Sequence, residues 1–106
     1  MKILSGGCRV YEAGDGAISQ FGNWTARSVL STASGARQIT QAVNDYAPGI
    51  SPAVVNPNSE EVLYVASGEG VCGIDGFAYP IRPGTAIFIP PGARYHFEGS
   101  TPLRVI

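Results

Sequence analysis

Short apolar segments alternate with clusters of turn-forming residues along almost the whole chain. Many of the intervals between these clusters are close to the roughly 8 to 12 residues that separate the turns of an antiparallel β-sandwich or barrel. No segment keeps a helical repeat of apolar residues for about three turns, although residues 19–31 are ambiguous. The 14 glycines and 8 prolines suit many tight turns. We therefore predict an all-β fold.

Strands are predicted over the segments Ala26–Thr32, Gln38–Tyr46, Glu61–Ala66, Val71–Ile74, Phe77–Ile81, Ala86–Ile89, Tyr95–Glu98 and Leu103–Ile106. The clearest local signal is Asp75-Gly76 between two apolar segments, because a two-residue type I′ turn needs positive φ at both central positions. A hairpin is expected there. The segment Ala86–Ile89 is apolar on both faces, which predicts an inner strand between two layers.

Composition narrows the class of protein. A chain of 106 residues is expected to form a single domain, residues 1–106, with a real core. The net charge is −1 and the basic residues are scattered, which excludes nucleic acid and anionic membrane surfaces as partners. No signal-peptide pattern or membrane-spanning segment is present, so a cytoplasmic location is expected. Cys8 and Cys72 lack metal-binding or disulfide spacing and are expected to be free thiols.

The strand that starts at Glu61 carries the residue on which the chemistry depends. Side chains two apart on a strand share a face, so if Glu61 points inward, Leu63 and Val65 do too. Val62 and Tyr64 would then point outward. A shift of register by one residue would reverse this, and would place the neighbouring glutamate inside instead.

The same alternation gives the other candidate site residues. Continued backward through the turn at residues 57–58, it places Val54 and Asn56 in the interior. On the late strand, Tyr95 and Phe97 share one face and His96 lies on the opposite one. The expected binding residues are therefore Val54, Asn56, Glu61, Tyr95 and Phe97. Asn56 serving only the turn, and Tyr95 serving only as barrel filling, are the simpler alternatives.

Two motifs in the chain resemble those of small single-domain cupins. The first cupin motif is a glycine, five residues, His-x-His, three or four residues, a glutamate, six residues and a glycine. The corresponding residues here are Gly49, Val54, Asn56, Glu61 and Gly68, with four residues between Gly49 and Val54. The second motif is a glycine, five residues, Pro-x-Gly, two residues, a histidine, three residues and an asparagine. The corresponding residues are Gly84, Pro90, Gly92, Tyr95 and Gly99, so the motif-bearing part is 49–99.

The resemblance implies a jelly-roll barrel, also called a double-stranded β-helix, whose interior holds a divalent metal on three histidines and the glutamate. Here Val54, Asn56 and Tyr95 stand at the histidine positions and Glu61 alone is kept, so the metal site is degenerate and no cofactor is predicted. The alternative is a metal such as Mn, Fe, Zn or Ni bound by some set of Glu61, Tyr95, His96 and Asn56. It requires a tyrosinate ligand or a β-bulge that turns His96 inward.

A carboxyl group inside a barrel without a cation should either be protonated or accept hydrogen bonds from nearby donors, and we expect a cluster of Glu61, Tyr95 and Asn56. The expected function is binding of a small organic molecule, a sugar or an organic acid, without chemistry. The alternative is an enzyme of the cupin dioxygenase, decarboxylase or isomerase type. Such an enzyme would be metal-dependent, or would use Glu61 as general base and Tyr95 as acid.

Self-association is also expected. The cupin resemblance implies a homodimer, and an open sheet edge near Lys2–Leu4 or at the final strand is suited to pairing across a two-fold axis. The printed chain ends at Ile106 inside an apolar strand pattern. We therefore expect either a partner that covers this strand or further chain that continues it.

Overall fold

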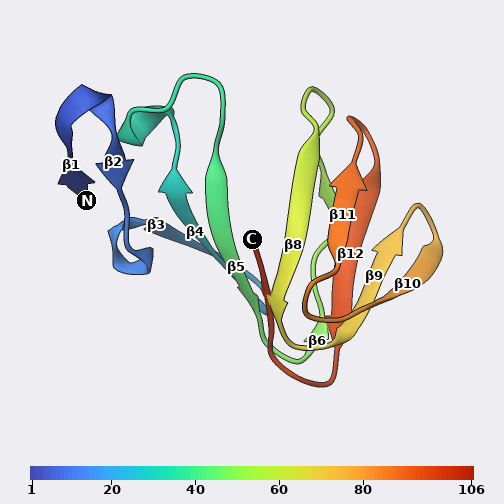
Figure 1. Cartoon of the computed structure of the whole chain (residues 1–106). Coiled ribbons are helices and arrows are strands. Elements are labelled where there is room, and N and C mark those ends of the chain that lie inside the picture. The colour runs from blue at the N-terminus through green and yellow to red at the C-terminus, as the bar shows by residue number, and fades with distance from the viewer.

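The computed structural model describes residues 1–106, apart from the side chain of residue 13. Antiparallel strands make up most of the architecture, so the all-β prediction is confirmed (Figure 1). The strands are β1 (Lys2–Ile3), β2 (Arg9–Val10), β3 (Ala17–Phe21), β4 (Trp24–Leu30), β5 (Gln41–Tyr46), β6 (Gly49–Ile50), β7 (Val54–Val55), β8 (Glu61–Ser67), β9 (Gly70–Ile74), β10 (Phe77–Ile81), β11 (Ala86–Ile89), β12 (Arg94–Gly99) and β13 (Leu103–Val105). Short 3₁₀ turns are η1 (Ser5–Gly7), η2 (Ala13–Asp15) and η3 (Thr32–Ser34).

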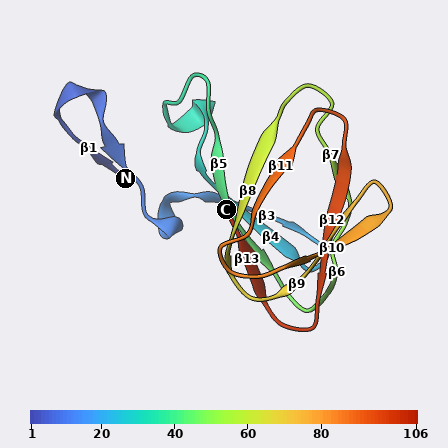
Figure 2. The ribbon, with the colours of Figure 1, turned by 45° about the vertical axis from the view of Figure 1, so that its right-hand side comes forward.

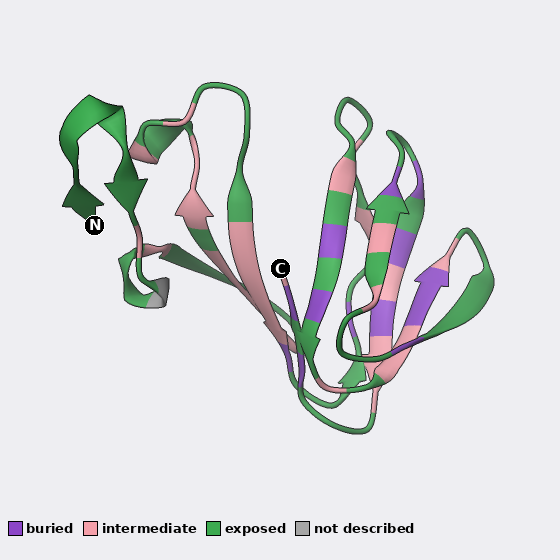
Figure 3. Ribbon diagram, in the orientation of Figure 1, coloured by how far each residue is buried: buried purple, intermediate pink, exposed green. Residues whose placement is uncertain are grey.

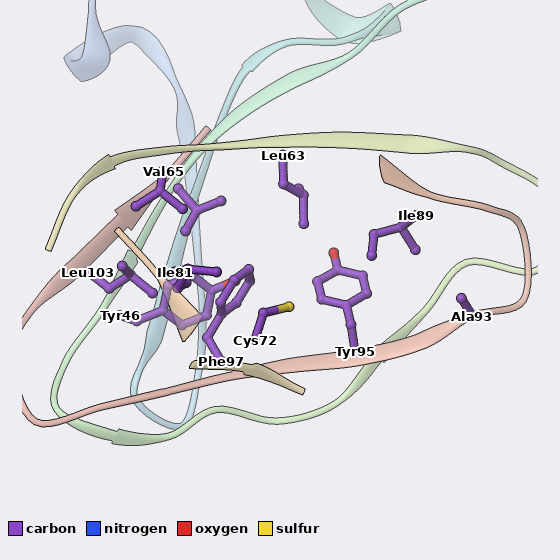
Figure 4. Close-up of a cluster of buried hydrophobic side chains, with 11 residues drawn as sticks. Tyr46, Leu63, Val65, Cys72, Ile81, Ile89, Ala93, Tyr95, Phe97 and Leu103 are labelled. Atoms are coloured by element: carbon purple, nitrogen blue, oxygen red, sulfur yellow. The ribbon is translucent and has the colours of Figure 1, made fainter. Parts of the chain in front are cut away.

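Two sheets enclose the core as a jelly-roll barrel. One has the strand order β10-β9-β12-β6, with β7 also paired to β12, and the other has the order β11-β8-β13-β5-β4-β3 (Figure 2). Between them lie the buried side chains Tyr46, Leu63, Val65, Cys72, Ile81, Ile89, Ala93, Tyr95, Phe97, Leu103 and Val105 (Figure 4). A small separate ribbon, β1 with β2, lies at the N-terminal end.

The predicted alternation along β8 is confirmed. Leu63 and Val65 are buried, whereas Val62 is 72% exposed and Tyr64 is 51% exposed. Figure 3 shows this as alternating buried and exposed bands along the strand. The register of β8 is therefore the one that directs Glu61 to the interior.

The predicted hairpin between β9 and β10 is also confirmed. Ile74 pairs with Phe77, so Asp75 and Gly76 form the two-residue connection. Their φ angles are 48° and 87°, the positive values that a type I′ turn requires.

The prediction for Ala86–Ile89 was correct in its bounds and wrong in its position. This segment is β11, which pairs with β8 and stands at the edge of the six-stranded sheet. Its inward side chain Ile89 is buried, but Phe88 is 57% exposed. Apolar residues on both faces therefore do not mark an inner strand here, because the outer face of β11 is uncovered in a single copy.

The ambiguous segment 19–31 lies in the β3–β4 hairpin. Phe21 pairs with Trp24 across a tight turn, and Gly22 has a φ of 61°, so a glycine suits this corner. The strand predicted from residue 38 begins later, at Gln41. β1, β2 and the connection between β4 and β5 extend away from the barrel, and the molecule measures 45 × 28 × 24 Å (Figure 1). Among the described residues, no helix has the length and apolar character needed to cross a membrane.

Candidate functional site

Three polar side chains from separate segments meet inside the barrel. Glu61 starts β8, Asn56 follows β7, and Tyr95 lies on β12. The Tyr95 hydroxyl donates to Glu61 Oε2 at 2.8 Å, and the Asn56 amide Nδ2 donates to Glu61 Oε1. Both oxygens of the carboxylate therefore accept a hydrogen bond from a neutral donor.

Backbone pairing positions these donors. Val54 on β7 is the register partner of Tyr95 on β12. The backbone carbonyl of Asn56 accepts a hydrogen bond of 2.9 Å from Gly92 N, in the turn that leads into β12. The segment carrying Asn56 is thus tied to the strand carrying Tyr95, and both face the start of β8.

The environment of Tyr95 keeps its phenol protonated. Only 4% of the residue is exposed. Burial is the main cause that raises the pKa of Tyr95, and the hydrogen bond to Glu61 and the charge of Glu61 raise it further. At neutral pH the side chain is a hydrogen-bond donor, which suits its contact with Glu61 and disfavours a tyrosinate ligand.

Tyr46 and Cys72 also face this interior, and the sequence analysis did not include them in the site (Figure 4). Burial raises the pKa of the Cys72 thiol to about 11. Burial also raises the pKa of Tyr46, with smaller contributions from Glu61 and Cys72. Both residues lie in predicted strands, Tyr46 at the end of Gln38–Tyr46 and Cys72 within Val71–Ile74. The inward direction of Cys72 follows from its pairing with the buried Phe97.

Phe97 and Val54, the two apolar candidates, are packing residues beside the cluster. Phe97 is buried deep in the core, with its ring centroid 4.9 Å from that of Tyr46 and 5.9 Å from that of Tyr95. It therefore packs behind the Tyr95 ring. Val54 is half-buried and packs against the core.

His96 lies on the opposite face of β12, as the alternation predicts. β12 pairs with β9 in continuous register from Tyr95 to Glu98, which keeps His96 outward. Its Nε2 lies 2.8 Å from Glu98 Oε1. Its ring lies against Gly73, where an added Cβ would be 2.2 Å from the His96 Cε1 atom. His96 is therefore not available to join Glu61 at a metal.

The donor set does not fit the metal that the motif implies. The side chains at the four ligand positions are an aliphatic group, an amide, one carboxylate and a protonated phenol, from Val54, Asn56, Glu61 and Tyr95. First-row metals in proteins favour imidazole, thiolate or several carboxylates. Within the described part of the chain, no three His, Cys, Asp or Glu side chains gather in a way that would hold an ion.

A slot between β5 and β8 adjoins Glu61. β13 pairs with both strands, and Ile106 exchanges two backbone hydrogen bonds with Tyr64. β5 and β8 diverge toward the start of β8 (Figure 1). The slot is a cavity of about 510 Å³. The residues that line it include Leu30, Ile39, Gln41, Glu61, Leu63 and Ile106. A larger cavity of about 1020 Å³, near Ile50 and Arg82, is lined by other residues.

Residues 43–106 match a protein-family profile described as Cupin domain. Solved structures resemble nearly the whole chain. A predicted oxalate decarboxylase from Thermotoga maritima has a TM-score of 0.74 and 22% identity, over 92% of this chain and 94% of the other. Ectoine synthase from P. lautus has a TM-score of 0.80 and 19% identity, over 92% and 74%. A putative ethanolamine utilization protein Q from Salmonella typhimurium has a TM-score of 0.79 and 17% identity, over 98% and 86%.

At these identities the likeness shows the fold, and the predicted jelly-roll barrel is confirmed. No curated protein matches the chain in sequence.

The hydrogen bonds to Glu61 predict different costs for two substitutions. In Glu61→Gln the side-chain carbonyl oxygen can still accept the hydrogen bond from Asn56. The new NH₂ group can donate to the hydroxyl oxygen of Tyr95 after that hydroxyl rotates. We expect it to change the free energy of unfolding by less than about 1 kcal/mol, or to stabilise the fold. Tyr95→Phe removes a donor to the carboxylate and should cost about 1.5 to 3 kcal/mol. Urea unfolding measures both, with the exposed Glu60→Gln as control. Equal losses for Glu61→Gln and Tyr95→Phe would contradict the assignment.

The buried thiol predicts a loss of stability at alkaline pH. The pKa of Cys72 is raised from 9.0 to about 11, so between these values the unfolded chain loses a proton that the folded chain keeps. The free energy of unfolding should therefore fall as pH rises through this window, by at most about 1.4 kcal/mol per pH unit for this group. Above pH 10, Tyr46 and Tyr95 steepen the fall in the same sense.

Urea unfolding at pH 8 to 10.5 tests this pH dependence. In Cys72→Ala the free energy of unfolding should fall less steeply with pH between pH 9 and 10. This difference in slope is expected whether or not the substitution changes the stability at pH 8. Cys8→Ala leaves the buried thiol in place and serves as the control. An unchanged slope in Cys72→Ala would show that the thiol is not protected by burial.

Proposed function

Since the chain belongs to the cupin family, we propose that it binds a small organic molecule at Glu61, without a histidine-bound metal and without catalysing a reaction. The observation that carries this proposal is the carboxylate of Glu61, which accepts hydrogen bonds from Tyr95 and Asn56 inside the barrel. A concave apolar site with a few convergent polar groups is typical of small-molecule binding.

The chemistry of the cluster favours a neutral, hydroxyl-rich ligand over an organic acid. A carboxylate has about four lone-pair positions, and the two hydrogen bonds within the cluster leave capacity for further donors. Sugar hydroxyls supply such donors. An organic acid would instead bring a second negative charge close to Glu61, which is unfavourable at low dielectric. Of the two ligand classes predicted from the sequence, a sugar or related polyol fits better.

The slot offers space next to this carboxylate. Its volume of about 510 Å³ lies within the range of roughly 300 to 1,000 Å³ that is usual for small-molecule sites. Its lining combines aliphatic side chains such as Leu30 and Leu63 with the polar Gln41 and Asn44. A ligand in the slot would therefore contact both apolar surface and hydrogen-bonding groups.

The direct hydrogen bond between Glu61 and Tyr95 supports one alternative function. In a metal-free enzyme Glu61 would accept a proton from the substrate and Tyr95 would donate one, with the phenol held in its protonated form by burial. The similar structures whose names include a reaction are less than 25% identical to this chain. The likeness to them therefore shows a shared fold and does not support a shared reaction.

Ligand screening by thermal shift and calorimetry tests the binding proposal. Neutral monosaccharides and polyols should raise the melting temperature, and dicarboxylic acids should raise it less. Glu61→Gln should weaken the best ligand at least about tenfold, because hydrogen bonds to a charged acceptor are worth about 1.5 to 3 kcal/mol. The exposed Glu69→Gln is the control. Equal binding by Glu61→Gln, or no binding by any sugar or polyol, would contradict the proposal.

Metal analysis of the same samples tests the proposal that the site binds its ligand without a metal. We expect less than stoichiometric Mn, Fe, Zn and Ni, and no change in melting temperature on adding EDTA. A stoichiometric metal with a chelator-sensitive melting temperature would contradict a metal-free site. Chemical conversion of the bound sugar or polyol, lost in both Glu61→Gln and Tyr95→Phe, would establish the acid–base alternative.

A further inference from the structure

A second cavity adjoins the slot, and the charged residues that line it are both arginines. Its volume is about 620 Å³. Arg9 and Arg37 line it together with Tyr11 and several apolar residues, and within the described part of the chain no Asp or Glu belongs to its lining. An arginine stays protonated in proteins. This cavity, which we name the arginine pocket, is therefore positively charged.

The backbone after β4 holds the guanidinium of Arg9 in place. Arg9 Nη1 donates a hydrogen bond of 2.6 Å to the carbonyl oxygen of Ser34 in η3, and the Tyr11 hydroxyl donates to the same oxygen. The next residue, Gly35, leaves the room for this contact, because a Cβ there would lie 1.6 Å from Arg9 Nη1. A guanidinium has five N–H donors, so the bond to Ser34 leaves others for a ligand.

Neither arginine of the pocket is neutralised by a carboxylate of the protein. Within the described part of the chain, the ion pairs involve other residues, Asp15 with the N-terminal amine, His96 with Glu98, and Arg104 with Asp45. Two positive charges that line one cavity repel each other, and a bound anion relieves this repulsion. The planar guanidinium also matches the geometry of carboxylate and phosphate groups. The arginine pocket therefore suits an anionic group.

The arginine pocket and the slot share part of their lining. Leu30, Ile39 and Gln41 line both cavities. Leu30 pairs with Gln41 where β4 ends and β5 begins, so the boundary between the two cavities lies at this end of the β4–β5 pair. A ligand in the slot can therefore extend past these residues toward the arginines.

Glu61 lies at the same end of the sheet as this boundary. Val105 on β13 is the antiparallel partner of Asn44 on β5 and of Val65 on β8, so β5 and β8 run parallel. Both strands begin at this end, β5 at Gln41 and β8 at Glu61. Since β13 pairs between them, two strand spacings separate them by about 10 Å or more. A ligand of about this length reaches from Glu61 to the arginine pocket.

We propose that the arginine pocket is an anion subsite, which holds the phosphate or carboxylate group of a ligand whose hydroxyl groups bond to Glu61. The hydroxyl part of this ligand rests on the function proposed above. The two cavities are complementary to such a molecule, because Glu60 and Glu61 line the slot and Arg9 and Arg37 line the arginine pocket. The part of the ligand beside Glu61 stays uncharged, and its negative charge lies with the arginines.

Calorimetry with matched sugars tests the proposal. Glucose 6-phosphate is compared with glucose, and trehalose 6-phosphate with trehalose, so that each pair differs by a phosphate group. In at least one pair the phosphorylated sugar should bind at least about tenfold tighter, because charge-assisted hydrogen bonds are about twice as strong as neutral ones. Glucuronate distinguishes the two anionic groups. A gain over glucose as large as that of glucose 6-phosphate would show that the subsite also takes a carboxylate.

Substitutions of the two arginines locate the gain in affinity. Arg37→Ala and Arg9→Gln should each remove most of the tenfold difference between the phosphorylated sugar and its neutral counterpart. Arg9→Gln also loses the contact with Ser34, so Arg37→Ala keeps the test decisive if the other variant does not fold. The control is Arg82→Ala, which removes the same charge from the larger cavity and should leave the difference intact.

The outcomes separate this proposal from the function proposed above. A neutral sugar whose binding depends on Glu61, with no gain from the phosphate, would overturn the anion subsite alone. So would a gain that both arginine variants keep, or one that Arg82→Ala removes equally. A gain that requires the arginines, with Glu61→Gln weakening neither sugar, would contradict binding at Glu61 and overturn the link between the two cavities. No binding by any of these sugars would contradict both proposals.

Discussion

The structure depends on one requirement, that the carboxylate of Glu61 be satisfied inside the barrel by neutral donors. A charged group removed from water is costly unless hydrogen bonds or opposite charges replace its hydration. Tyr95 and Asn56 supply two hydrogen bonds, one to each oxygen. The rest of the barrel holds these donors in place, through the pairing of Val54 with Tyr95 and the packing of Phe97 behind the Tyr95 ring.

This arrangement relates the chain to its family. The four positions that the cupin motifs give as metal ligands are occupied here by Val54, Asn56, Glu61 and Tyr95, and the last three form hydrogen bonds with one another. The buried phenol of Tyr95 stays protonated because burial raises its pKa, and His96 is directed to the outer face against Gly73. The cluster therefore presents hydrogen-bonding groups to the interior of the barrel.

Much of the fold could be predicted from local patterns. The Asp75-Gly76 turn and the alternation from Glu61 to Val65 follow from backbone sterics and a period of two. The position of Ala86–Ile89 could not be predicted, because apolar residues on both faces are compatible with an inner strand and with the edge strand that β11 forms. For the site, parity identified Glu61, Tyr95 and Asn56. The slot is lined by residues from segments far apart in the chain, such as Leu30, Gln41 and Leu63, which no local signal brings together.

A double-mutant cycle between Glu61→Met and Tyr95→Phe tests the central claim most directly. The cycle isolates the interaction between the two side chains from the packing cost of each substitution. A buried hydrogen bond to a charged acceptor predicts a favourable coupling of about 1.5 to 3 kcal/mol in the free energy of unfolding. A coupling near zero would show that the carboxylate is not held by the Tyr95 hydroxyl and would contradict the account.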